Sequence, residues 1–333
     1  MANSSEREKI LITGGTGFIG SHLARQLTQL GHQIVLFDIQ PNHHRIDDFK
    51  DKVEVVKGDV AKRRDLEETI RTHKIKHIFH TAASLSVNAE RDISSAYSGN
   101  IDGTYNILEA CHTMQIQKVV FLSSLAVFGA NTPFPFHEKS YRDPGSFYGV
   151  SKAFGEMLGQ YYHLRHNLDF RCVRFAVIIG PGRRGAGATV TFSSLIEKIA
   201  LGKPAVVDVP ESTLLPITYV DDSVGFLIAL WQADKFQRRP FIVGGVPATV
   251  TDLIAEMKKH MDKVDVRFEI DSEAERVATT WSFLTTLLIQ QGQEELYRDI
   301  KEVGWKLKYN TTQDIVKRFV EDVQSHKEIY SAF

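Results

Sequence analysis

Lys9-Ile-Leu-Ile-Thr-Gly-Gly-Thr-Gly-Phe-Ile-Gly20 is the stretch that decides the fold of this chain. Its apolar first half predicts a short buried strand, which runs directly into a glycine-rich turn and then into a helix. Two glycine spacings fit: Gly15, Gly17 and Gly20 match G-x-G-x-x-G, and Gly14 can replace Gly15 in the wider G-x-x-G-x-x-G. Glycine permits a tight turn, close helix packing and the approach of backbone to a pyrophosphate. The N-terminus of the helix would offer free N–H groups to that anion.

The surroundings of the glycines strengthen this prediction, because three glycines alone occur in many turns. The helix that follows has an apolar face at helical spacing, formed by Ile19, Leu23, Leu27 and Leu30. A second strand over 33–38 then ends in the acidic residue Asp38. A strand, a glycine turn, a helix and a second strand with a terminal acid together predict a dinucleotide-binding unit.

Strand and helix patterns alternate from the N-terminus to about residue 175. Further strands are predicted over 53–60, 76–83, 118–124 and 170–175. Helices are predicted over 65–72, 96–114 and 148–166. Such alternation is typical of βαβ units and a parallel sheet. We therefore predict an α/β protein with a Rossmann-type, doubly wound parallel sheet, which binds its ligand outside the carboxyl ends of the strands.

The alternation stops beyond Gly180-Pro-Gly182, where glycine, arginine and helical patterns prevail. We predict a dinucleotide-binding domain over residues 1–175 and a smaller, mostly helical substrate-binding lobe over 176–333. An apolar run over 240–245 is expected to form a late strand that rejoins the main sheet.

The bulk composition excludes several classes of protein. A formal net charge of -1, from 40 basic and 41 acidic residues, gives no electrostatic reason to expect nucleic acid or an anionic membrane as a partner. The two cysteines, Cys111 and Cys172, are too few for a disulfide scaffold. No stretch has the length and hydrophobicity of a membrane span or a signal core. We therefore expect a cytoplasmic protein with reduced thiols.

The run Tyr148-Gly-Val-Ser-Lys152 places a phenol and an amine one helical turn apart on the same face. An ammonium beside a phenol stabilises the phenolate and lowers the phenol's pKa, so Tyr148 could take a proton from an alcohol or return it to a carbonyl. Ser124, at the end of a predicted strand, could hydrogen-bond the same substrate oxygen. Because these residues follow a dinucleotide fingerprint, we interpret Ser124, Tyr148 and Lys152 as catalytic residues for hydride transfer between a small molecule and a nicotinamide.

The histidines do not predict a metal site. The pairs His43 with His44 and His163 with His166 lack a carboxylate or cysteine pattern that would complete one, so no metal is expected. His80, at the end of a strand, is predicted to make a structural hydrogen bond.

Taken together, these motifs resemble those of the extended short-chain dehydrogenases/reductases, the NAD-dependent epimerase/dehydratase family. The matching segments span more than half of the chain: they are 13–20, Asp38, 58–60, 80–83, Asn100, 103–104, 123–124, Tyr148 with Lys152, and Arg174 with 180–182.

The resemblance implies NAD as the cofactor and a set of residues that bind it. Asp38 would bind the adenosine ribose hydroxyls and repel a 2′-phosphate, which favours NAD over NADP. Asp59 and Val60 would flank the adenine, and Ala82 and Ala83 would lie along the cofactor. The remaining implied cofactor contacts are Gly14, Gly17, Phe18, Ile19, Gly20, Asn100, Tyr148 and Lys152.

Two positions separate the chain from the sugar-nucleotide enzymes of this family. Val177 stands where those enzymes carry an asparagine, and Leu215 stands where they often carry an arginine, so a diphosphate would meet fewer donors. The runs around Ser124 and Tyr148 are more similar to the short-chain L-threonine 3-dehydrogenase branch, from which residues 281–298 depart. The expected substrate is a small polar β-hydroxy acid or sugar acid. The expected substrate contacts are Ser84, Ser124, Val177, Arg183 and Leu215.

Two other functions stay open. An NDP-sugar 4-epimerase or dehydratase would use the same three catalytic residues with tightly bound NAD, and a non-catalytic NAD-binding module would leave them idle. The resemblance also implies a homodimer packed through the helices predicted over 96–114 and 148–166.

Overall fold

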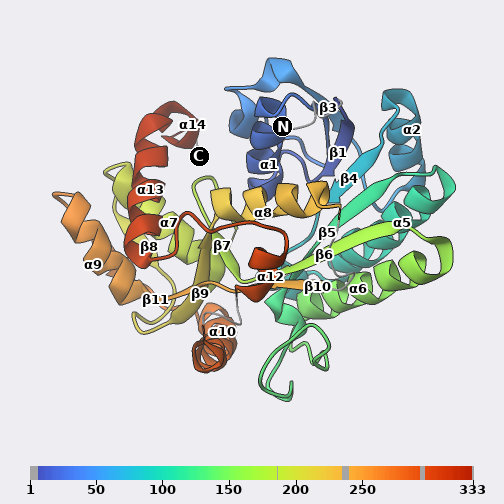
Figure 1. Ribbon diagram of the computed structural model, residues 1–333. Helices are drawn as coiled ribbons and strands as arrows, with labels where there is room; N and C mark the ends of the chain where they lie inside the picture. The colour runs from blue at the N-terminus through green and yellow to red at the C-terminus, as the bar shows by residue number, and fades with distance from the viewer. Residues whose placement is uncertain (1–6, 186, 235–239, 293–296, 332–333) are drawn as a thin grey trace. The chain divides into compact units, whose positions relative to one another are not determined.

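The computed structural model describes residues 7–185, 187–234, 240–292 and 297–331 of the chain (Figure 1). These residues form two compact units. The first unit consists of Met1–Val127, Pro144–Arg174 and Val224–Phe241, and the second consists of Phe128–Asp143, Phe175–Ser223 and Ile242–Phe333.

A seven-stranded sheet forms the centre of the first unit, in the order β10-β6-β5-β4-β1-β2-β3. Its strands are β1 (Lys9–Thr13), β2 (Gln33–Asp38), β3 (Val53–Lys57), β4 (His77–His80), β5 (Lys118–Ser124), β6 (Asp169–Phe175) and β10 (Pro240–Val243). Strand β1 pairs in parallel with both β2 and β4, and the outer pairs β2 with β3 and β4 with β5 are also parallel. This is the strand order of a doubly wound sheet, whose ligand site lies beside β1. The predicted Rossmann-type α/β fold is confirmed.

The strands of this sheet are apolar because both of its faces are covered. Ile10, Leu11 and Ile12 follow one another in β1, and none of the three is exposed. Continuous apolar runs of this kind are typical of parallel strands with helices on both faces. The helices that begin in or belong to this unit are α1 (Phe18–Gln29), α2 (Arg63–His73), α3 (Ser86–Arg91), α4 (Ile93–Ala96), α5 (Gly103–Thr113), α6 (Phe147–His166) and α8 (Val220–Gln232).

The helix predicted over 96–114 is divided by a π-helical turn over Tyr97–Asp102. Asn100 is buried in this turn, and its side chain bonds to groups outside the helix. The carbonyl oxygen of Asn100 accepts a hydrogen bond from the Thr104 hydroxyl at 2.6 Å. A π turn adds one residue to the helical repeat and is frequent at functional sites, whereas hydrophobic periodicity alone does not reveal it.

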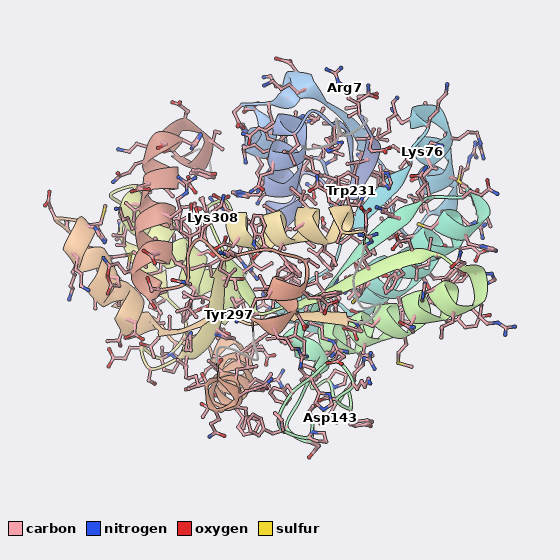
Figure 2. All side chains as sticks on the ribbon, viewed as in Figure 1. Arg7, Lys76, Asp143, Trp231, Tyr297 and Lys308 are labelled. Atoms are coloured by element: carbon pink, nitrogen blue, oxygen red, sulfur yellow. The ribbon has the colours of Figure 1, made fainter. Side chains whose placement is uncertain are left out.

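The end of α8 is attached to the sheet of the first unit at the residue labelled Trp231 in Figure 2. The Trp231 ring packs edge-on against the rings of His32 and His77, with centroids 5.1 and 5.2 Å apart. The carbonyl oxygen of Trp231 accepts hydrogen bonds from Arg171 at 2.8 Å and from Lys118 at 3.2 Å. Cations at a helix C-terminus satisfy its free carbonyls and complement its dipole.

The second unit contains two small sheets and several helices. One sheet has the order β11-β9-β7 and the other pairs β12 with β8. Its strands are β7 (Val177–Ile179), β8 (Ala205–Val207), β9 (Leu214–Tyr219), β11 (Val246–Thr249) and β12 (Val266–Phe268). Its helices are α7 (Ala188–Ala200), α9 (Val250–His260), α10 (Ser272–Gln291), α12 (Arg298–Glu302), α13 (Thr312–Ser325) and α14 (Lys327–Ser331).

Helix α10 fills most of the segment 281–298 that departs from the threonine dehydrogenase pattern, of which residues 293–296 lie outside the described part. Trp281, Leu284 and Leu288 are buried along one side of α10, so these apolar residues pack within the second unit. At the end of the helix, the Gln291 side chain accepts the backbone N–H of Phe136 at 2.9 Å and donates to its carbonyl oxygen at 2.6 Å.

Across the described residues, no helix is both long and apolar enough to cross a membrane. Cys111 and Cys172 are buried and free of disulfide bonds.

Candidate functional site

The glycine turn after β1 is built by close backbone contacts. Gly14 has φ +65°, and a Cβ atom there would lie 2.9 Å from the Cα of Ala82. A Cβ atom on Gly20 would lie 2.2 Å from the carbonyl oxygen of Gly14. The structure therefore brings Gly14, Gly20 and Ala82 together, and both glycines are required by packing as well as by the turn.

Helix α1 begins directly after this turn. Its N-cap residue is Gly17, no side chain caps its first N–H groups, and its first turn holds no acidic residue. Phe18 and Ile19, the first helical residues, are half-buried. A helix N-terminus without a capping side chain leaves backbone N–H groups for an anion.

Asp38 ends β2 and is bonded to the glycine turn. One of its carboxylate oxygens accepts the backbone N–H of Thr16 at 3.1 Å and the Thr16 hydroxyl at 2.8 Å. The other oxygen accepts the N–H of Gln40 at 3.1 Å. These donors hold the carboxylate at the carboxyl end of β2, beside β1.

The turn after β3 carries Asp59 and Val60. The Asp59 carboxylate accepts the N–H of Ala61 at 2.9 Å. The Asn106 side chain donates to the carbonyl oxygens of Val60 and Ala61, both at 3.0 Å. Val60 packs so closely on Gly103 that a Cβ atom there would lie 2.6 Å from the valine side chain. Helix α5 therefore fixes this turn.

Asn100 connects the segment after β4 to helix α6. Its side-chain oxygen accepts the N–H of Ser84 at 2.8 Å, and its side-chain nitrogen donates to the Ser84 carbonyl at 3.0 Å. The same nitrogen donates to the Ser151 hydroxyl at 3.2 Å, which donates to the Tyr148 carbonyl at 2.8 Å. Ala83, next to Ser84, is half-buried. The structure therefore joins Ser84, Asn100 and the start of α6 in one hydrogen-bonded chain.

His80, the last residue of β4, lies fully buried in a second hydrogen-bonded chain. Its Nε2 lies 3.1 Å from the Thr104 hydroxyl, and its Nδ1 lies 2.7 Å from the Thr13 hydroxyl. Because the Thr104 hydroxyl gives its proton to the Asn100 carbonyl, it accepts from His80 Nε2, so Nδ1 accepts from Thr13. Burial and the nearby Lys152 charge lower the pKa of His80 to about 3. The imidazole is therefore neutral, and its bonds are structural.

Tyr148 and Lys152 lie one turn apart on α6. The Lys152 Nζ is 5.5 Å from the centre of the Tyr148 ring and 4.9 Å from that of Phe121. Lys152 is almost completely buried, whereas Tyr148 is half-buried. Burial lowers the pKa of Lys152 to about 8, against the raising effect of Cys172 and Glu156. The amine therefore changes its charge close to physiological pH.

Ser124, at the end of β5, belongs to a turn on which α6 is packed. Its hydroxyl accepts the N–H of Ala126 at 3.1 Å, and the side chain is buried. A Cβ atom on Gly149 would lie 2.2 Å from the carbonyl oxygen of Ala126. The glycine that follows Tyr148 therefore lets the start of α6 approach the Ser124 turn. Gly149 is a positioning residue that the sequence analysis did not select, although it adjoins the tyrosine of the motif.

Glu156 and Arg174 form a further buried group that the sequence analysis did not select for the site. The Arg174 Nε and Nη2 atoms each donate to the Glu156 carboxylate at 2.7 Å, and neither side chain is exposed. The Ser123 hydroxyl donates to the same carboxylate at 2.6 Å. Two features of the sequence could have indicated this pair. Glu156 is an acid one helical turn beyond Lys152, on a helix face of small residues, and Arg174 is an arginine within an apolar strand.

The remaining expected substrate contacts lie in the second unit. Val177 in β7 and Leu215 in β9 are buried within the three-stranded sheet, where Val177 pairs with Ile217 and Leu215 pairs with Ala248.

Arg183, which follows β7, is bonded inside its own segment. Its guanidinium donates to the Ile178 carbonyl and, at 3.1 Å, to the Thr189 hydroxyl.

In the described part of the chain, no group of three or more histidine, cysteine, aspartate or glutamate side chains could hold a metal ion. The candidate residues of the first unit instead gather at the carboxyl ends of the strands: Gly14 after β1, Asp38 on β2, Asp59 after β3, Ala82 after β4 and Ser124 on β5. This is where a doubly wound sheet binds its ligand.

The chain is similar in sequence to a known family and to several enzymes. Residues 10–244 match the model of the NAD dependent epimerase/dehydratase family. The mitochondrial L-threonine 3-dehydrogenase of Bos taurus is 27% identical over 288 residues, which cover 84% of this chain and 75% of the relative. The D-erythronate dehydrogenase of Cupriavidus necator is 30% identical over 292 residues, which cover 82% of this chain and 89% of the relative.

A solved structure is also similar over almost the whole chain. The holo form of a GalE-like L-threonine dehydrogenase from Cupriavidus necator superimposes with a TM-score of 0.82 at 25% identity, and the match covers 95% of this chain and 99% of that protein.

Proposed function

The chain belongs to the NAD dependent epimerase/dehydratase family, and on that premise we propose that it is a dehydrogenase of small polar alcohols. It oxidises a secondary alcohol of a β-hydroxy acid or sugar acid to the ketone, with NAD as the hydride acceptor. The observation that carries this proposal is the buried Lys152 ammonium beside Tyr148, on a helix packed against the end of β5.

The described residues fit NAD. The close approach of Gly14 to Ala82 and the uncapped start of α1 suit a pyrophosphate, and the Asp38 carboxylate at the end of β2 suits ribose hydroxyls. When bound, NAD supplies the nicotinamide that accepts or returns a hydride. The residues that would hold it are Gly14, Gly17, Phe18, Ile19, Gly20, Asp38, Asp59, Val60, Ala82, Ala83, Asn100, Tyr148 and Lys152.

Tyr148 is the general base in the oxidation. Its phenolate would take the proton of the substrate hydroxyl as the secondary alcohol becomes a ketone, for which bound NAD would supply the hydride acceptor. The Lys152 ammonium stabilises the phenolate, and the Ser124 hydroxyl donates to the substrate oxygen. In the reverse direction, the Tyr148 phenol returns the proton to the carbonyl oxygen.

The substrate class is proposed from two sources. Val177 and Leu215 are apolar and buried, so neither supplies a hydrogen-bond donor to a diphosphate. The two relatives above are named for threonine, a β-hydroxy amino acid, and for D-erythronate, a sugar acid. Ser84 and Ser124 are the polar residues of the first unit that we assign to a substrate of this kind.

The second candidate is an NDP-sugar epimerase, because the family includes epimerases. That enzyme returns the hydride to its substrate, so it produces no net NADH and retains its NAD. The discriminating experiment incubates the purified protein and NAD with L-threonine, D-erythronate and a panel of related hydroxy acids, and in parallel with UDP-sugars. Net NADH with a hydroxy acid supports the dehydrogenase. Interconversion of UDP-sugars without net NADH would replace it with the epimerase.

We further propose a homodimer that packs through α5 and α6. Large apolar side chains are exposed along one side of α6, at Val150, Met157, Tyr161 and Leu164. Their spacing of three, four and seven residues keeps them on one helical face, and such contiguous apolar patches mark interaction surfaces. The two buried cysteines form no disulfide bond, which fits a reducing compartment, for which we propose the cytoplasm.

A further inference from the structure

We propose that Glu156 is a positioning residue of the catalytic site, which holds helix α6 in register and keeps the Lys152 ammonium charged. The inference rests on the proposed function, because it assigns a role beside Tyr148 and Lys152. It concerns side chains of the first unit alone.

Glu156 is bonded to two strands at once: to β5 through the Ser123 hydroxyl at 2.6 Å and to β6 through two Arg174 nitrogens at 2.7 Å. Because the two anchors lie on neighbouring strands, α6 cannot slide or rotate without breaking one of them. Ser123 also directly precedes Ser124, so the same bond fixes the end of β5.

The helical repeat aligns Glu156 with Tyr148 and Lys152. Tyr148, Lys152 and Glu156 are spaced by four residues, which places them on successive turns along one face of α6. The anchored carboxylate therefore fixes α6 one turn beyond the lysine, as the Asn100–Ser151 bond fixes it beside the lysine.

Groups from α6 and from three strands of the sheet surround Lys152. On α6 it faces Tyr148 and Glu156, and from the strands it is approached by the Phe121 ring, the Cys172 thiol and His80. His80 is neutral, so the carboxylate of Glu156 is the fixed negative charge among these groups. Arg174, which is paired with that carboxylate, is a buried positive charge on β6.

Burial opposes the lysine's charge, and Glu156 supports it. The pKa of Lys152 is lowered to about 8, so it lies near the pH at which the enzyme would work. Loss of the carboxylate would lower the pKa of the buried amine further. A neutral amine cannot stabilise the phenolate, so Tyr148 would lose its base form even if its position were unchanged.

The test uses the full chain with the double substitution Glu156→Met/Arg174→Met, which removes both charges and replaces the buried pair by apolar volume. Glu156→Asp is the control that keeps the charge, and Glu156→Gln is a second variant, which removes the carboxylate but leaves the buried Arg174 cation unpaired. The first readout is an ultraviolet titration in which each variant is compared with its own Tyr148→Phe derivative, so that the difference reports Tyr148 alone.

We expect the Tyr148 phenolate to form at a pH about one unit higher in Glu156→Gln, because the unpaired Arg174 cation adds to the loss of the carboxylate. The shift should be smaller in the double variant, which removes both charges, and the acidic limb of kcat/KM for NADH formation should move with the midpoint in each variant. The Asp control should keep the wild-type midpoint. An unchanged midpoint in Glu156→Gln and in the double variant, with native circular dichroism, would overturn the inference. The ultraviolet titration needs no substrate. If the wild type forms no NADH with any hydroxy acid, the proposed function is wrong. The ultraviolet titration still tests the inference about Glu156 in that case.

Discussion

Thr16 donates both its backbone N–H and its hydroxyl to one carboxylate oxygen of Asp38, at 3.1 and 2.8 Å. These hydrogen bonds join the glycine turn after β1 to the end of β2, and they hold the acid at the carboxyl ends of the two strands. An acid so placed is suited to bind vicinal hydroxyls and to repel a phosphate on the same sugar. Two predictions concern this turn.

Asp38→Ala should weaken NAD binding by about 10- to 100-fold, because it removes hydrogen bonds between a carboxylate and the ribose. Binding of NADP should weaken less or improve, since the repulsion of its 2′-phosphate is also removed. Titration calorimetry with both cofactors measures the two changes. Asp47→Ala, at an exposed aspartate of the same segment, is the matched control and should change neither affinity. An unchanged NAD affinity in Asp38→Ala would contradict the assigned role.

Gly20→Ala should destabilise the fold by about 2 kcal/mol or more and weaken NAD binding, because the added Cβ would lie 2.2 Å from the Gly14 carbonyl oxygen. Urea unfolding measures the loss of free energy. Gly99→Ala is the control, since a Cβ atom there meets nothing within 4 Å. Equal stability of the two variants would show that α1 does not need this close contact.

Lys152→Met should stabilise the ligand-free fold near pH 7 by up to about 3 kcal/mol, because the fold buries an ammonium whose pKa is lowered to about 8. Between that value and the ordinary value of 10.5, the unfolded chain binds more protons than the folded chain. The free energy of unfolding of the wild type should therefore increase as the pH rises through this window, because folding then no longer buries a charged Lys152. The variant should not show this increase.

Urea unfolding of Lys152→Met and wild type at pH 7 and pH 10 checks this prediction. Lys203→Met, at an exposed lysine, serves as the control and should leave the pH dependence intact. A variant less stable than the wild type at pH 7 would mean that interactions of the ammonium in the folded state outweigh the cost of burying it.

Leu164→Glu should convert the proposed homodimer to a monomer, because it places a charge on the most exposed apolar side chain of α6. Light scattering should give a mass of 37.6 kDa for the variant and twice that for the wild type. Ile39→Glu, at an equally apolar exposed position outside α6, should remain a dimer. A monomeric wild type at micromolar concentration would refute the proposed dimer itself.

The fold could be predicted from the sequence because its signals are local. The apolar run in β1, the glycines and the acid at the end of β2 each lie within a few residues of one another, and parallel strands bring their carboxyl ends to one edge. The gathering of Gly14, Asp38, Asp59, Ala82 and Ser124 at that edge follows from topology alone.

The parts that could not be predicted depend on contacts between distant segments. Glu156 and Arg174 are 18 residues apart and meet because α6 packs on β6, which no periodicity reports. The π-helical turn around Asn100 shifts the repeat by one residue and is invisible in an apolar pattern. The bond from the Arg183 guanidinium to the Ile178 carbonyl likewise depends on the turn after β7, whose conformation the local sequence does not specify.

NADH formation by a tyrosine variant tests whether Tyr148 transfers the proton during oxidation by NAD. NADH formation is followed for the wild type, Tyr148→Phe and the control Tyr161→Phe, with L-threonine, D-erythronate and related hydroxy acids as substrates, and NAD affinity is measured in parallel. We predict NADH formation by the wild type and the control, a kcat lower by about 10²- to 10⁴-fold in Tyr148→Phe, and similar NAD affinity in all three. A Tyr148→Phe variant that oxidises the substrate at the wild-type rate would show that the Tyr148 phenol does not transfer the proton.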